Sequence, residues 1–77
     1  MRIEATTEVP YYVQILRDLR RAERISQREL ADRMGVVQSM ISEWESGRCS
    51  PNSASLIRWA AEFGYTVQLV PDQMWVT

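Results

Sequence analysis

The chain has 77 residues, enough for one small domain whose modest core often needs support from a second subunit. It has no histidine and a single cysteine, Cys49, so an internal disulfide is excluded and the commonest catalytic base and metal ligands are missing. The first ten residues lack the apolar core of a secretory signal, and no apolar run is long enough to span a membrane. We therefore expect a cytoplasmic protein with no catalytic residues, no metal, no cofactor and no membrane partner.

Charge is unevenly distributed along the chain. All nine basic residues are arginines, and the formal net charge is −1. Residues 17–58 hold eight of these arginines against six acids, so a basic middle lies between acidic ends. Arginine suits phosphate, but a solvated helix surface with i,i+4 ion pairs is an equally good interpretation, and charge alone does not decide between them.

The first predicted helix runs from about Pro10 to about Arg24. Val9 precedes a proline and is expected to be extended, while proline is favoured at the start of a helix. The apolar face is formed at helical spacing by Val13, Leu16 and either Leu19 or Arg20.

A second, short helix begins at a predicted capping box. In this box Ser26 and Glu29 satisfy each other's backbone N–H groups, and Gly35 ends the helix because it tolerates a left-handed backbone. The apolar face of this helix consists of Leu30, Ala31 and Met34. The result is a helix of about two turns followed by a sharp turn.

A third helix is predicted from Gln38 to Gly47. One face carries Ile41, Trp44 and Glu45, and the other carries Ser39, Ser42, Glu43 and Ser46. Val37 has no side-chain oxygen to cap this helix, at a cost of roughly 1 kcal/mol unless Val36 and Ile41 form a hydrophobic staple.

A fourth helix follows, capped by Asn52 or Ser50 beside Pro51 and ending at Gly64. Its expected buried residues are Leu56, Ile57, Ala60 and Phe63. From residue 65 the period changes to two, which predicts a strand over 65–70 that Pro71 ends. One face of this strand carries Tyr65, Val67 and Leu69. Because one strand cannot satisfy its own backbone, it needs either a second copy of the chain or residues 2–6 as a partner.

The run SQRELADRMGVVQSMISEWESGR resembles the phage repressor and Cro type of helix-turn-helix, the XRE family. The match is carried by Ser26, Gln27, Leu30, Ala31, Gly35, Val36, Ile41, Ser42, Trp44, Glu45 and Gly47. It extends through SPNSASLIRWAAEFG and covers roughly residues 11–64. The resemblance implies a mainly α, lambda-repressor-like bundle of about four helices, from which the short C-terminal β-strand is a departure. We expect an arm or short strand at 1–9, the helix-turn-helix domain at 10–64, and a dimerisation strand and tail at 65–77.

The same resemblance assigns expected roles to individual residues. DNA bases would be read in the major groove, where every base pair shows a distinct pattern, by Val37, Gln38, Ser39, Ser42 and Glu43. For Glu43, where many relatives carry a basic or amide residue, a solvated surface acid is an equal alternative. DNA phosphates would be contacted by Gln27, Arg28, Arg48 and Asn52, although an exposed surface role is an equal alternative for Arg28. Arg20 and Glu45 match positions of a partly buried structural ion pair. The strand pattern adds an expected dimer seam at Tyr65, Val67, Leu69 and Trp75.

The resemblance implies a sequence-specific transcriptional regulator, Cro-like or repressor-like, and with the strand pattern it predicts a homodimer that acts on an inverted-repeat operator in double-stranded DNA. Its setting would be the cytoplasm of a bacterium or a phage-infected cell. One alternative is an antitoxin that represses its own operon and also binds a toxin. Another is an interaction module that has lost DNA binding, which the sequence pI of about 5.3 favours.

Overall fold

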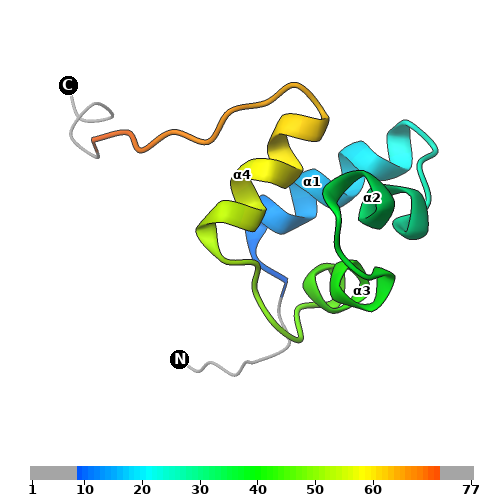
Figure 1. The fold of residues 1–77 in the computed structure, drawn as a ribbon. Helices are drawn as coiled ribbons and strands as arrows, with labels where there is room; N and C mark the ends of the chain where they lie inside the picture. Colours follow the sequence, from blue (N-terminus) through cyan, green and yellow to red (C-terminus); the bar gives the residue numbers. More distant parts are fainter. Residues whose placement is uncertain (1–8, 72–77) are drawn as a thin grey trace.

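The computed structural model describes residues 9–71, and this part of the chain folds into four helices (Figure 1). The helices are α1 (Tyr11–Ala22), α2 (Gln27–Met34), α3 (Gln38–Ser46) and α4 (Ser53–Glu62). Their order and approximate bounds confirm the predicted mainly α, helix-turn-helix bundle. No helix in the described part of the chain is long and apolar enough to cross a membrane.

The helices pack unequally against one another. α2 packs against both α3 and α4, and α1 packs against α3, whereas α1 and α4 approach each other less closely. In Figure 1, α3 lies at one end of the molecule, and the chain after α4 leaves the helical body at the other end. The surface of α3 is therefore well separated from the C-terminal segment.

The boundaries of α2 follow from its end residues. The Ser26 hydroxyl accepts a hydrogen bond from the Glu29 backbone N–H at 3.0 Å, and Gly35 takes the left-handed conformation at φ 72°. The predicted capping box forms in this one direction, because the Glu29 carboxylate accepts instead from Arg33, 2.8 Å away and one turn later. A serine cap and a glycine stop thus define this helix.

The connection from α1 to α2 contains an unusual backbone conformation. Arg24 has φ 59°, the one positive φ of a non-glycine residue between residues 9 and 71. Around it, the Ile25 N–H donates to the Arg20 carbonyl at 3.1 Å and the Arg24 N–H donates to the Arg21 carbonyl at 3.0 Å. This pairing is a Schellman motif, in which glycine is the usual left-handed residue.

α4 is capped by Asn52 rather than Ser50, because the Asn52 side-chain oxygen accepts from the Ser55 N–H at 2.8 Å. The helix ends before Gly64, which has φ 82°, and the Tyr65 N–H returns to the Ala60 carbonyl at 3.0 Å. Both ends of α4 therefore use the residue types that the sequence places there.

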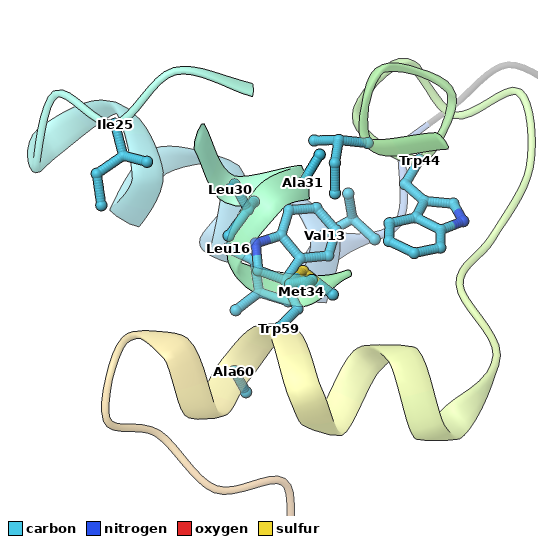
Figure 2. Close-up of a cluster of buried hydrophobic side chains, with 10 residues drawn as sticks. Val13, Leu16, Ile25, Leu30, Ala31, Met34, Trp44, Trp59 and Ala60 are labelled. Carbon is cyan, nitrogen blue, oxygen red and sulfur yellow. The ribbon is translucent and has the colours of Figure 1, made fainter. Parts of the chain in front are cut away.

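The core lies between the four helices and contains two packed indole rings (Figure 2). Its buried members are Val13, Leu16, Ile25, Leu30, Ala31, Met34, Ile41, Trp44, Trp59 and Ala60. The ring centroids of Trp44 on α3 and Trp59 on α4 are 5.8 Å apart. Trp59 is fully buried, so α4 contributes its largest side chain to the centre of the bundle.

The predicted buried face of α4 needs one correction. Ile57 is 53% exposed, and Trp59 takes the place expected for it in the core. At about 100° per residue, Leu56, Trp59, Ala60 and Phe63 fall within one stripe of the helix, whereas Ile57 lies about 100° away from Leu56. The large indole ring decides which of the two possible stripes faces inward, because its burial removes more apolar surface from water.

The predicted strand over 65–70 is not formed in the single chain. These residues have no regular secondary structure, and no backbone hydrogen bond within residues 9–71 involves residues 66–70. A strand requires a second strand beside it to satisfy its backbone groups, and no such strand is present in the described part of the chain. The alternative partner, residues 2–6, lies outside the described residues, as does Trp75 of the expected dimer seam.

Candidate functional site

The two faces of α3 differ sharply in burial. Its inner face places Ile41, Trp44 and Glu45 in the interior. Its outer face exposes Gln38, Ser39, Ser42, Glu43 and Ser46 to solvent. A nine-residue helix thus combines a core-forming stripe with a polar face that no other part of the described chain covers.

The polar groups at the start of α3 are available to a ligand. Within residues 9–71, the side chains of Gln38, Ser39 and Ser42 make no hydrogen bonds, although each has both donor and acceptor capacity. Val37 precedes them with 65% exposure and provides no side-chain cap. This end of α3 therefore presents hydrogen-bonding groups beside one apolar side chain.

Val36 replaces the missing cap in part. It is half-buried and packs against the core cluster that contains Ile41, as expected for a hydrophobic staple at the start of α3. The turn from Gly35 to Val37 is thus held by apolar packing as well as by the left-handed glycine.

Glu43 on the outer face is partly engaged by the loop that follows α3. Its backbone carbonyl accepts from the Arg48 N–H at 3.0 Å, and its carboxylate accepts from the thiol of Cys49, with Sγ 3.6 Å from Oε1. Partial desolvation and the hydrogen bond and charge of Glu43 raise the pKa of the Cys49 thiol. One carboxylate oxygen of Glu43 remains free for a further contact.

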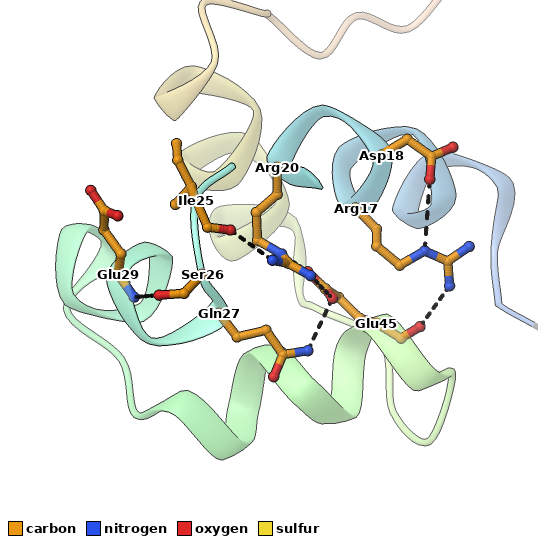
Figure 3. Close-up of polar contacts among 8 residues, drawn as sticks. All are labelled: Arg17, Asp18, Arg20, Ile25, Ser26, Gln27, Glu29 and Glu45. Atoms are coloured by element: carbon orange, nitrogen blue, oxygen red, sulfur yellow. Dashed lines mark hydrogen bonds and ion pairs between the residues drawn. The ribbon is translucent and has the colours of Figure 1, made fainter. Parts of the chain in front are cut away.

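A buried ion pair fixes α3 to α1 (Figure 3). The guanidinium of Arg20 donates to both carboxylate oxygens of Glu45, through Nε at 2.7 Å and Nη2 at 2.9 Å. Its Nη1 donates to the Ile25 carbonyl at 2.7 Å, and both Arg20 and Glu45 are buried. A bidentate pair of this kind restricts the rotation of α3 about its own axis.

Gln27, at the first position of α2, points toward the same carboxylate. Its Nε2 donates to Glu45 Oε1 at 3.0 Å, so part of this side chain has a structural role (Figure 3). An amide nitrogen carries two hydrogens, and one remains for another acceptor. Free backbone N–H groups at the start of α2 lie beside it.

A second arginine also holds the C-terminal end of α3, and the sequence analysis assigned it no role. Arg17 Nη1 donates to the backbone carbonyl of Glu45 at 3.2 Å, and Arg17 Nε lies 3.9 Å from Asp18. The spacing of Arg17 and Arg20 along one helix face is the available signal, but such pairs are common on exposed helix surfaces. Arg17 is thus a structural residue of the site that the pattern alone did not reveal.

The structure divides the exposed arginines into two groups. Arg33 pairs with Glu29 at 2.8 Å and Arg58 pairs with Glu62 at 3.5 Å, each one turn apart on its helix. Four other arginines have no acidic partner within the described range, namely Arg21, Arg24, Arg28 and Arg48. Arg28 and Arg48 lie at the start of α2 and just after α3, where the sequence predicted contacts to phosphate.

The two polar atoms of the Asn52 side chain differ in their contacts. Its oxygen caps α4, while the residue itself is exposed and its amide nitrogen is free to donate.

The segment that contains Tyr65, Val67 and Leu69 follows α4 and lies away from α3 (Figure 1), so the described chain holds two separate candidate surfaces. Among its residues, no three His, Cys, Asp or Glu side chains cluster as a metal site requires.

Comparison with known proteins gives two matches. The sequence profile of the Helix-turn-helix family HTH_3 matches residues 16–70. The chain is also 38% identical over 64 residues to the Uncharacterized HTH-type transcriptional regulator y4dL of Sinorhizobium fredii (strain NBRC 101917 / NGR234). The matched region covers 83% of this chain and 33% of y4dL, so the chain spans about a third of the length of this relative. No solved structure gives a significant match.

Proposed function

We propose a function from one premise, that the chain belongs to the XRE-type helix-turn-helix family. The function is sequence-specific binding of double-stranded DNA by a transcriptional regulator, with α3 in the major groove. The observation that carries this proposal is the division of α3 into a buried stripe and an uncovered polar face. The major groove admits one α-helix and shows a different donor and acceptor pattern for each base pair.

The proposed base contacts come from the exposed start of α3. Gln38 suits adenine because its amide supplies the matching donor and acceptor, and Ser39 and Ser42 hydrogen-bond to either kind of base edge. Val37 suits the methyl group of thymine. Glu43 accepts from the cytosine amino group through the carboxylate oxygen that Cys49 does not occupy.

The proposed phosphate contacts surround these residues. Arg28 and Arg48 have no acidic partner within the described residues, so their guanidinium groups are available to DNA. Gln27 contributes its second amide hydrogen and the free N–H groups at the start of α2, and Asn52 contributes its amide nitrogen. Phosphate contacts of this type set position and affinity rather than sequence preference.

The proposed regulator is a homodimer, Cro-like or repressor-like in its operator. Residues 65–70 have an alternating pattern and no strand partner within residues 9–71, so pairing with a second copy would satisfy their backbone groups. Tyr65, Val67 and Leu69 form the seam, together with Trp75. Two recognition helices related by a two-fold axis would then sit roughly 34–36 Å apart on an inverted repeat.

The decisive experiment is selection of binding sites from a random pool of double-stranded DNA by the purified protein. We expect an inverted repeat, and we expect Gln38→Ala to relax the preference at one position of each half-site at a cost of roughly 1–3 kcal/mol. Enrichment of no sequence, or an equal loss by Gln38→Ala on every sequence, contradicts the proposal.

Arg48→Ala provides the matched control for base readout. It should weaken binding to all sequences about equally and lower the salt dependence of binding by roughly one ion per protomer. Titrations at several salt concentrations measure this change. An unchanged slope would remove Arg48 from the phosphate contacts without affecting the assignment of Gln38.

A further inference from the structure

An apolar groove lies between α1 and α4, on a different surface from the exposed face of α3. Its volume is about 240 Å³, and its walls include Ile15, Leu19, Leu56, Ala60, Tyr65 and Val67. No charged side chain lines it, so it offers an apolar ligand surface and nothing to orient a charged one.

The start of the C-terminal segment forms one wall of this groove. Tyr65, Thr66 and Val67 line it, and Leu69, two residues further along the chain, is 99% exposed. Nothing in the described part of the chain covers the Leu69 side chain. Burial of a leucine side chain is favourable, so covering Leu69 would stabilise a complex between two chains.

We propose that this groove receives Leu69 from a second copy of the chain, so that the two copies exchange leucines across the seam. The proposal rests on the strand dimer described under the proposed function. It extends that dimer from backbone pairing of residues 65–70 to a specific apolar contact with α1 and α4.

Strand geometry supports the exchange. Residues directly opposite each other in an antiparallel pair point to the same face of the sheet. In a two-fold pair, the odd-numbered residues of both strands therefore share one face, and this face carries two of the groove-lining residues, Tyr65 and Val67. A register centred on Val67 places the partner's Leu69 opposite Tyr65, and a register centred on Gln68 places it opposite Val67. Both of these opposing residues are walls of the groove.

The size of the groove favours a side chain as its occupant. Sites for small molecules and cofactors are typically about 300–1,000 Å³ and combine an apolar lining with a few placed polar groups. A cavity of about 150 Å³ is sufficient for a benzene molecule. At about 240 Å³, the groove fits one or two aliphatic side chains.

The test measures the dimer dissociation constant by sedimentation equilibrium without DNA. Leu69→Ser should raise this constant by roughly tenfold or more, because each dimer loses two buried leucine side chains. Ile15→Ser, on the opposite wall of the groove, should raise it similarly. Val70→Ser is the matched control, since Val70 is 46% exposed but lies on the other face of the strand, and it should change the constant less than Leu69→Ser does.

A double variant distinguishes the groove from the strand alone. If Leu69 and Ile15 meet across the seam, the effects of Leu69→Ser and Ile15→Ser combine to less than their sum. Equal effects of Leu69→Ser and Val70→Ser overturn the proposal. The proposal is also overturned if Ile15→Ser lowers the melting temperature but leaves the dimer dissociation constant unchanged. In that case Ile15 contributes to the stability of one chain and not to the contact between two chains.

The outcome also separates this proposal from DNA binding. A monomeric wild-type protein at the highest soluble concentration overturns the leucine exchange and the strand dimer together. The selection experiment would still report whether the monomer prefers a DNA half-site. Conversely, the wild-type dimer can be weakened by Leu69→Ser and yet select no DNA sequence. That result supports the groove contact and contradicts sequence-specific DNA binding.

Discussion

Replacing Glu45 by glutamine should destabilise the fold strongly. The Glu45 carboxylate is 4% exposed and accepts three hydrogen bonds, two from Arg20 at 2.7 and 2.9 Å and one from Gln27 at 3.0 Å. A glutamine of the same shape has one acceptor oxygen and a nitrogen that donates. At least one of these donors is then left without an acceptor, and the buried Arg20 loses its counter-charge.

The expected cost is roughly 3–5 kcal/mol, the usual penalty for removing one member of a buried ion pair. A domain of this length has a total stability of about 4–12 kcal/mol, so the loss is a large fraction of it. At about 4–8 °C per kcal/mol, the melting temperature should fall by roughly 12 °C or more. Urea unfolding followed by circular dichroism measures the free energy directly.

Two controls separate the charge effect from a general effect of substitution. Removing both charges with Arg20→Met and Glu45→Met should cost less than either single change, because no unpaired charge remains buried. Glu29→Gln breaks the exposed pair with Arg33 and should cost less than roughly 0.5 kcal/mol. A Glu45→Gln variant within about 1 kcal/mol of the wild type would refute the reasoning, as would a double variant whose loss equals the sum of the single losses.

Three further expectations concern the loops and caps. Arg24→Gly should raise the free energy of unfolding by about 1 kcal/mol, because Arg24 holds φ 59°, whereas Arg24→Ala should leave it unchanged in urea titrations. Asn52→Ala should lower it by about 1 kcal/mol through loss of the α4 cap, and an unchanged value would show that the Ser55 N–H finds another acceptor. The Cys49 thiol, whose pKa is raised by desolvation and by Glu43, holds less thiolate near neutral pH than an ordinary cysteine. Iodoacetamide should therefore alkylate it slowly, and Glu43→Gln should shift the rate profile to lower pH; identical profiles would contradict the hydrogen bond.

The turn between α2 and α3 was predictable because its signals are local. Ser26 caps α2, and Gly35 and Gly47 take the left-handed conformation, at φ 72° and 86°, that ends α2 and α3. Each signal acts within one helical turn, through a hydrogen bond or a backbone angle that the residue type itself favours. The exposed polar face of α3 follows from the same spacing, once the helix boundaries are known.

Features that depend on distant contacts were not predictable in the same way. Ile57 and Trp59 each fit one of two apolar stripes on α4, and the structure buries Trp59 beside Trp44 and leaves Ile57 exposed. The alternating pattern at 65–70 shows that these side chains favour a β-strand. A strand also needs a second strand for backbone hydrogen bonds, and residues 9–71 do not provide one. Arg28 and Arg33 are likewise alike in sequence, since Asp32 and Glu29 lie four residues from them on the same helix, but only Arg33 forms the ion pair.

The orientation of α3 depends on residues that do not face the proposed ligand. At its C-terminal end, Arg20 holds the Glu45 carboxylate and Arg17 holds the Glu45 carbonyl at 3.2 Å. At its N-terminal end, the left-handed Gly35 sets the direction of the chain. Both ends are thus fixed by the fold before any ligand is present, which avoids an ordering cost on binding. On the proposed function, an Arg20 variant therefore loses affinity for all DNA sequences about equally, because α3 is held less firmly, whereas Gln38→Ala loses it at one base position of each half-site.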